Sequence, residues 1–180
     1  MDKLIFTHKF NSIESLINIL KDNKIVCGSK LDKKYRILSG GEPSNYVYTT
    51  ILNKKLLENK IDNDIPTVLI SPKILKSKKM IFNKMWQSIE TKDSIITNPK
   101  ENNKNKLKKI FKIIDETLEK KVGWPYNNEA LFRNEIKMKY IFGIVIPKKY
   151  LSKIKKYLPE DIKIYHSYEN IFDEPLSKDI

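Results

Sequence analysis

A glutamate at the start of an apolar run is the residue of this sequence best suited to carry chemistry. Glu129 directly precedes Ala130-Leu131-Phe132, and a second apolar run spans residues 140–146. We interpret the two runs as a strand pair with the carboxylate at its mouth. A carboxylate held there would face a cleft beside the sheet, where it suits orienting a hydroxyl group or stabilising a cation.

The sequence contains two histidines, His8 and His166, and one cysteine, Cys27. His8 lies directly before a helix start, which favours hydrogen bonding to a polar ligand and disfavours a protonated ring. The alternative is a histidine that caps local backbone. His166 is interpreted as a surface residue and Cys27 as a small core residue, since nothing visibly activates a Cys27–His8 nucleophile pair. Neither histidine has zinc-ligand spacing, so the sequence predicts no metal site.

Two tyrosines lie at a spacing that places them together. Tyr46 and Tyr48 are two residues apart in a β-branched and aromatic segment, so on one strand they share a face. They could stack on a flat heterocycle or belong to the core. The polar loop before them contains Gly40-Gly41 and is of the kind that closes over a ligand.

The length and composition fit one soluble domain over residues 1–180. The chain has 180 residues with 40% apolar content, enough for a core without disulfides or metals. No apolar run approaches the roughly 20 residues of a membrane span. The first ten residues lack the features of a signal peptide, and a single cysteine excludes a disulfide framework. We therefore expect a cytoplasmic protein of a reducing compartment that does not enter a membrane.

The net charge of +13 leaves two interpretations open. Of 35 basic residues only Arg36 and Arg133 are arginine, and abundant Lys, Asn and Ile are typical of an AT-rich genome. Arginine is the side chain that bidentate phosphate and guanine contacts favour. Lysine alone still attracts a polyanion without sequence preference. A nucleic-acid partner and a solvated lysine coat both remain open.

The elements expected around these residues are short strands with fewer, longer helices. Strands are predicted at residues 4–7, 25–27, 46–52, 67–70 and 162–165, besides the pair described above; helices are predicted at 13–24, capped by Asn11 or Ser12, and at 53–63 and 104–121. Residues 32–45 are expected to form a loop, and 74–98 is the least regular part. The fold class that fits is α+β, with a split, mostly antiparallel sheet and flanking helices.

Three of these segments together resemble the ADP-ribosyltransferase superfamily, on the branch of the poly-ADP-ribose polymerases and DarT-type toxins with a His-Tyr-Glu site. Phe6-Thr7-His8 with residues 11–21 is similar to the family's first strand and helix. Residues 46–50 look like the strand that supplies a tyrosine. Residues 128–132 with 136–141 are similar to the stretch that holds the catalytic glutamate.

The resemblance implies a role for each of these residues. Glu129 would be catalytic, binding a hydroxyl of the nicotinamide ribose of NAD and favouring the oxocarbenium-like state. His8 would bind the adenosine ribose, with Thr7 beside it on the opposite face of the strand. Tyr48 would stack on nicotinamide, with Tyr46 as the alternative. NAD would be the co-substrate, and no metal would be needed.

The sequence departs from the family pattern at two places. Lys9 follows His8 where the family has a glycine, so the nucleotide loop is expected to differ. Glu135 competes with Glu129 for the catalytic role, and we favour Glu129 because Glu135 is expected in the polar turn between two strands.

The acceptor of ADP-ribose is left open. Lysine-rich segments 73–84 and 100–121 suit single-stranded DNA or RNA, with Trp86 available for stacking. A protein acceptor and an inhibitory partner protein are equally allowed. Removal of an RNA 2′-phosphate, another reaction of the superfamily, relies on arginines that this chain barely has. The competing class is a non-enzymatic, basic nucleic-acid- or host-protein-binding module on the same fold.

Overall fold

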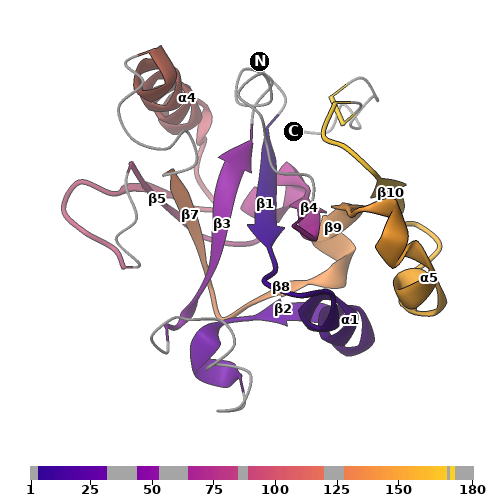
Figure 1. Ribbon diagram of the computed structural model, residues 1–180. Helices are drawn as coiled ribbons and strands as arrows, with labels where there is room; N and C mark the ends of the chain where they lie inside the picture. The colour runs from indigo at the N-terminus through magenta and orange to yellow at the C-terminus, as the bar shows by residue number, and fades with distance from the viewer. Residues whose placement is uncertain are drawn as a thin grey trace.

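A large sheet forms the centre of the computed structural model, which describes residues 4–31, 44–52, 65–84, 89–119, 128–169 and 171–172. Within these residues eight strands pair in the order β10-β9-β4-β1-β3-β7-β5-β6, and β2 pairs with β8 separately (Figure 1). Every pair is antiparallel except β10 with β9, which is parallel. The strands are β1 (Ile5–Lys9), β2 (Lys24–Val26), β3 (Tyr46–Leu52), β4 (Thr67–Ile70), β5 (Met80–Asn83), β6 (Ile95–Thr97), β7 (Glu129–Arg133), β8 (Glu135–Lys137), β9 (Ile141–Val145) and β10 (Lys163–Tyr165).

The sheet divides between its two central strands. β1 and β3 pair from Ile5–Leu52 to Thr7–Thr50, and the pairing stops there. Beyond that point β1 continues beside β4 as far as Lys9, while β3 continues beside β7 as far as Tyr46. The α+β fold with a split, mostly antiparallel sheet, predicted from the sequence, is confirmed.

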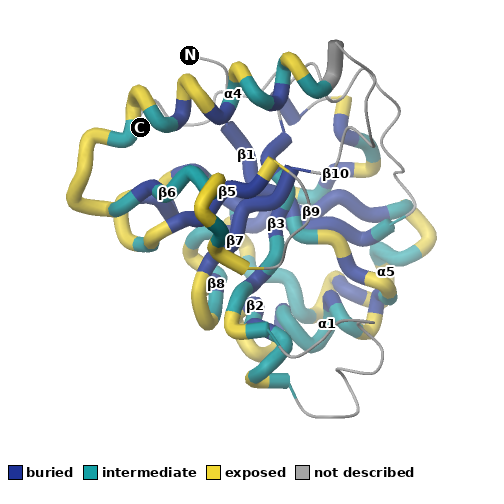
Figure 2. Tube along the Cα trace, turned by 90° about the vertical axis from the view of Figure 1, so that its left-hand side faces the viewer, coloured by how far each residue is buried: buried dark blue, intermediate teal, exposed yellow. Residues whose placement is uncertain are grey.

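The helices lie at the ends and one side of this sheet. They are α1 (Ile13–Asp22), α4 (Lys104–Glu119) and the short α5 (Leu151–Ile154), with 3-10 turns η1 (Gly28–Lys30), η2 (Pro72–Lys76), η3 (Met138–Tyr140), η4 (Lys148–Tyr150) and η5 (Lys155–Tyr157). α4 runs over one end of the buried strands and exposes its outer face, whereas α1 lies at the other end (Figure 2). No helix in the described part of the chain is long and apolar enough to cross a membrane.

Helix α1 forms where its capping residue and apolar spacing predict it. The Ser12 hydroxyl accepts a hydrogen bond from the Ser15 amide at 3.2 Å, so Ser12 is the N-cap. Leu16 and Leu20, four residues apart on one helix face, are buried in the core. The helix ends at Asp22, two residues earlier than expected, because Asn23 adopts a left-handed conformation with φ of 54°.

The predicted pairing of the Glu129 strand was wrong. β7 lies between β3 and β5, whereas β9, the second apolar run, lies between β4 and β10. The two strands are consecutive long runs in the sequence, but β8 and η3 between them carry the chain across to the other half of the sheet. Glu129 therefore begins an interior strand, where it ends the β5–β7 ladder opposite Asn83, and does not lie at the end of a β7–β9 pair.

Two further expectations differ from the structure. Residues 80–83, placed in the least regular part, form β5, because Met80-Ile81-Phe82 is buried against β7 on one side and β6 on the other. Glu135 begins β8 and forms a 3.6 Å ion pair with Lys24, so it does not lie in a polar turn. The predicted helix at 53–63, most of the loop at 32–45, and Trp86 lie outside the described residues.

Candidate active site

His8 bridges the place where β1 and β3 separate. In a continuing antiparallel ladder the Tyr48 carbonyl would receive a backbone amide of β1. Here the imidazole Nδ1 lies 2.6 Å from that carbonyl oxygen instead. A carbonyl only accepts, so Nδ1 carries the proton and donates. The ring also packs edge-on against Phe10, with centroids 4.8 Å apart.

The surroundings of His8 keep its ring neutral. Burial lowers the pKa of His8 from its ordinary value of 6.5, and the hydrogen bond to Tyr48 opposes this only in part. A neutral ring protonated at Nδ1 carries a lone pair on Nε2. In the described part of the chain no group pairs with Nε2. His8 therefore offers a hydrogen-bond acceptor at the split in the sheet.

Tyr46 and Tyr48 share one face of β3, as their spacing predicts. Both are half-buried, whereas Val47 between them is fully packed. Thr7 lies opposite Thr50 on this same face and is buried, with its hydroxyl donating to the Thr50 carbonyl at 3.4 Å. Because side chains alternate along a strand, His8 and Thr7 lie on opposite faces of β1, as expected.

Glu129 lies on the Tyr48 face of the sheet. Tyr48 pairs with Leu131, and Glu129 is two residues from Leu131 on the same strand. Such diagonal neighbours on antiparallel strands are about 7–8 Å apart, within reach of long side chains. The glutamate is only 1% exposed, so it is not a surface carboxylate at a strand edge. Burying a carboxylate is costly, which makes this position a candidate for function.

A buried amide holds the Glu129 carboxylate. Asn83 pairs with Glu129 across β5 and β7, and its Nδ2 donates to Glu129 Oε2 at 3.0 Å. Asn83 also bonds to the Ile89 carbonyl and to the Ser94 hydroxyl. Sequence reasoning missed both Asn83 and Ser94. The apolar run that ends in Asn83 was the available signal, because it marks a strand with a polar residue at its end.

Asn128 fixes β7 against β3 just before Glu129. Its side-chain Oδ1 accepts from the Ile51 amide at 2.8 Å, and its Nδ2 donates to the Ile51 carbonyl at 3.2 Å. The side chain thus makes the two hydrogen bonds that a backbone partner would make in the ladder. This pairing sets the register in which Glu129 lies across from Thr50.

The structure therefore brings together some of the predicted residues and separates others. His8 contacts the backbone of Tyr48, and the Tyr48 and Glu129 side chains share a face on adjacent strands. Glu135 lies on β8, in the separate two-stranded sheet. His166 is exposed, with Nδ1 3.0 Å from the Ile146 carbonyl, and Cys27 is buried, as predicted. Among the described residues no group of histidine, cysteine and acidic side chains could hold a metal ion.

Comparison with known proteins gives a family and a fold. A family model described as "Family of unknown function (DUF5846)" matches residues 1–121. The chain belongs to this family. No curated protein matches the sequence.

Solved structures similar to this chain include those of DarT proteins. "Thermus sp. 2.9 DarT in complex with NAD+" has a TM-score of 0.58 at 13% identity, covering 89% of this chain and 94% of that chain. The same protein "in complex with ADP-ribosylated ssDNA" has a TM-score of 0.58 at 11% identity, covering 89% and 93%. "Thermosipho africanus DarTG in complex with ADP-ribose" has a TM-score of 0.51 at 14% identity, covering 96% of this chain and 51% of that chain. This chain has a DarT-like ADP-ribosyltransferase fold.

Proposed function

We propose that this protein is a NAD-dependent mono-ADP-ribosyltransferase, which cleaves the nicotinamide–ribose bond of NAD and transfers ADP-ribose to a macromolecular acceptor. The observation that carries the proposal is the split between β1 and β3, with His8 bridging it and the buried Glu129 carboxylate on the adjoining half-sheet. The DarT-like fold, seen elsewhere with NAD+ bound, supports the same conclusion.

Glu129 is the proposed catalytic residue. When the glycosidic bond breaks, nicotinamide leaves with the bonding electron pair and becomes neutral, while positive charge develops on the ribose. An ionised carboxylate stabilises that charge and accepts a hydrogen bond from a ribose hydroxyl. The acceptor then attacks the ribose carbon through an oxygen or nitrogen and loses its proton. Preorganised groups of this kind typically contribute about 3–4 kcal/mol to the transition state.

His8 and the tyrosines would bind the dinucleotide. His8 Nε2 would accept a hydrogen bond from a hydroxyl of the adenosine ribose, since Nδ1–H is already donated to Tyr48. The half-buried Tyr48 ring would stack on nicotinamide, and Tyr46 is the alternative two residues away. Because the His8 and Tyr48 side chains lie on opposite faces of the sheet, NAD would have to cross the sheet at the point where β1 and β3 separate. Thr7, buried and bonded to β3, would shape the floor beside it.

For the acceptor we propose a single-stranded nucleic acid bound on the surface around α5. Five lysines lie in nine residues there, and all are exposed: Lys148, Lys149, Lys153, Lys155 and Lys156. No acidic residue occurs in the sequence between Glu135 and Glu160. None of the five lysines has an ion pair among the described residues. Lysine-rich surfaces of this kind attract phosphates.

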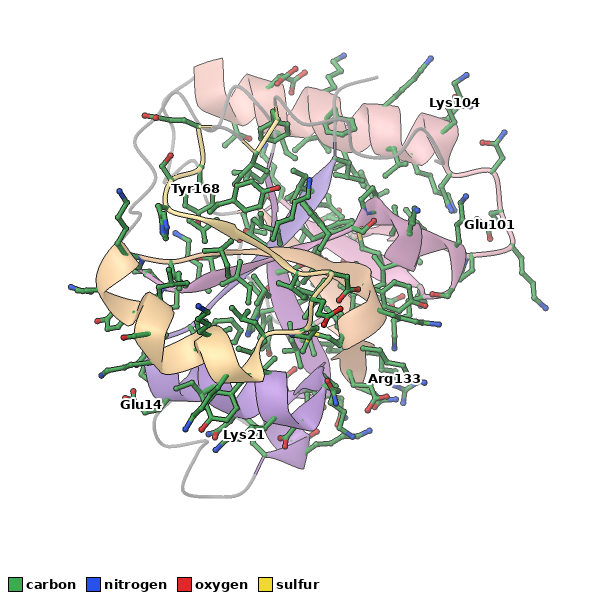
Figure 3. The ribbon with its side chains drawn as sticks, turned by 90° about the vertical axis from the view of Figure 1, so that its right-hand side faces the viewer. Glu14, Lys21, Glu101, Lys104, Arg133 and Tyr168 are labelled. Atoms are coloured by element: carbon green, nitrogen blue, oxygen red, sulfur yellow. The ribbon has the colours of Figure 1, made fainter. Side chains whose placement is uncertain are left out.

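Two tyrosines lie within this α5 surface. The Lys149 and Lys153 ammonium groups are 5.2 and 5.9 Å from the Tyr150 ring centroid. Lys156 and Lys21 flank Tyr157 at 4.9 and 5.0 Å, and Lys21 lies on α1 beneath α5 (Figure 3). The hydrogen bond from Lys156 lowers the pKa of Tyr157, and Lys21 adds to the effect. Aromatic rings among lysines are typical of surfaces that bind single strands by stacking.

The lysines named from the sequence are less available than those of the α5 surface. On and before α4, Lys106 pairs with Glu101 and Lys112 with Glu116. Near β5, Lys79 pairs with Glu90 at 3.1 Å. These carboxylates compete with phosphates for the same ammonium groups, so we expect segments 73–84 and 100–121 to contribute less to binding.

The decisive experiment compares Glu129→Gln with the wild-type protein. Glutamine preserves the shape and can still accept the Asn83 hydrogen bond, but it has no negative charge. We expect NAD binding and the unfolding midpoint to be retained, while nicotinamide release falls about 10²–10³-fold. Release is measured by chromatography with labelled NAD in the presence of protein, DNA and RNA pools, and mass spectrometry identifies the modified acceptor.

Glu135→Gln is the matched control, because it also removes one carboxylate that the sequence named as a competitor. It should leave nicotinamide release unchanged. If Glu135→Gln abolishes release and Glu129→Gln does not, the catalytic role belongs to Glu135. If the wild-type protein shows no saturable NAD binding, the protein is a non-enzymatic binding module instead.

A further inference from the structure

Asn83 is a buried polar residue outside the predicted His-Tyr-Glu set, and it is only 2% exposed. It is the last residue of β5 and lies directly across the ladder from Glu129. Its Nδ2 donates to Glu129 Oε2 at 3.0 Å and to the Ile89 carbonyl at 3.0 Å. Its Oδ1 accepts from the Ser94 hydroxyl at 2.6 Å. Every polar position of this amide is therefore oriented by a specific neighbour.

The neighbours determine which way the amide faces. Glu129 Oε2 and the Ile89 carbonyl oxygen only accept, so both must meet the NH₂ group. The reversed amide would place its own oxygen against these two acceptors. The Ser94 hydroxyl oxygen accepts a hydrogen bond from the Thr91 amide at 2.8 Å. Its own proton is therefore available to donate to Asn83 Oδ1. The loop carrying Thr91 and Ser94 thus holds Asn83, and Asn83 in turn holds one carboxylate oxygen.

We propose that Asn83 is the positioning residue for the Glu129 carboxylate, with Ser94 setting the direction of its amide. This inference rests on the proposed function. An amide suits this role because it donates to a carboxylate without bringing a positive charge. A lysine or arginine at the same place would neutralise the charge that stabilises the ribose cation. Misplacement of a catalytic group by about 1 Å can cost about 10²-fold in rate.

The test compares Asn83→Ala and Asn83→Asp with the wild-type protein in nicotinamide release from NAD. We expect Asn83→Ala to lower kcat about 10–100-fold, with KM for NAD within about 2-fold, because binding contacts elsewhere are retained. In Asn83→Asp a second carboxylate faces the first, and like charges at this range favour a shared proton. Its rate should therefore require a higher pH than that of the wild type, so the acidic limb of the pH–rate profile moves upward.

The matched control is Asn98→Ala, which removes another asparagine–glutamate hydrogen bond, 2.7 Å from Nδ2 to Glu101 Oε1 on the surface. It should leave kcat and the pH profile unchanged. If Asn83→Ala fails to fold, Ser94→Ala tests the same network, since it removes the bond to Asn83 Oδ1 together with the Ser94 bonds to Thr91 and leaves the Asn83–Glu129 bond in place; kcat should fall about 3–10-fold.

The outcomes separate this inference from the proposed function. If Glu129→Gln is inactive but Asn83→Ala keeps the wild-type kcat, the positioning role is overturned and the proposed function stands. The role is also overturned if the pH profile of Asn83→Asp matches the wild type, or if folded Ser94→Ala keeps the full rate. If Glu129→Gln itself retains the wild-type rate, the proposed function fails first.

Discussion

His8 shows how a single side chain takes a role that its sequence position only partly indicates. The sequence placed it at a strand end before a helix, as a ligand-binding residue or a local cap. The structure shows a ring whose Nδ1 replaces a ladder hydrogen bond between β1 and β3. That contact joins residues 40 positions apart, so no local pattern could reveal it. The same holds for Glu129, whose type was recognised but whose partner Asn83 was not.

The neutral state of His8 predicts how stability depends on pH. Because its pKa is lowered in the folded protein, the unfolded chain binds more protons below about pH 6.5, and stability falls there as pH decreases. The contribution is complete above that pH. Urea unfolding of the wild type between pH 7.5 and 5 should therefore show a decline that is smaller in His8→Gln, which does not titrate.

His166→Gln is the control for this pH dependence, since it removes the other histidine of the chain, which is exposed. It should follow the wild-type curve. The same titration should weaken NAD binding in the wild type, because a protonated Nε2 no longer accepts. An identical decline in all three proteins would show that His8 is not the group responsible.

At the scale of elements, the sequence predicted individual strands better than their partners. β3 and β4 begin and end at the expected residues, since both are short β-branched runs bounded by polar or turn-forming residues. β5 was missed because its four residues lie within an irregular lysine-rich segment. The pairing of β7 with β9 was wrong because strand partners are chosen by contacts distant in the sequence. The half-sheet that carries Glu129 could therefore be assembled only from the structure.

Asn128 joins two strands of the sheet, and its replacement should lower the free energy of unfolding measurably. Asn128→Ala removes both hydrogen bonds to Ile51 and leaves a buried amide and carbonyl of β3 without this partner. Each unsatisfied buried group costs about 1–3 kcal/mol, so we expect the free energy of unfolding to fall by at least about 1 kcal/mol. The urea midpoint measures this change.

The control for Asn128 is Asn102→Ala, because Asn102 is exposed and, among the described residues, its Oδ1 accepts one bond at 3.1 Å, from the amide of Lys104 at the start of α4. Asn102→Ala should lower the free energy of unfolding by less than Asn128→Ala does. We also expect nicotinamide release to fall in Asn128→Ala by more than the unfolded fraction explains, since Glu129 is the next residue. Release that follows the folded fraction alone would limit Asn128 to stability.

For the whole molecule, the distribution of charge is more informative than its total. The net charge of +13 suggested a polyanion partner or a lysine coat without distinguishing them. In the structure two lysines of α4, Lys106 and Lys112, pair with glutamates, whereas the α5 surface carries exposed lysines without ion pairs among the described residues. Helix α4 lies toward the edge of the sheet that contains β5 and β6, and α5 lies beside β10 at the other edge (Figure 1). Composition cannot give this arrangement, because it depends on which residues the fold brings together.

The two surfaces predict different responses to charge removal. Neutralising Lys149, Lys153 and Lys156 together with glutamine should weaken binding of single-stranded DNA and RNA, and should reduce the slope of log affinity against log salt by about 2, since each phosphate contact on a single strand contributes about 0.7. The same change at Lys79, Lys106 and Lys112, each of which pairs with a glutamate, is the matched control and should alter the slope by less than half as much. Fluorescence anisotropy over a salt series measures both. Nicotinamide release without acceptor should be unchanged in either variant, because neither surface contains Glu129, His8 or Tyr48. Equal slopes for the two variants would mean that the affinity for nucleic acid depends only on the total charge of the protein. That result would contradict the proposal that the acceptor binds on the α5 surface.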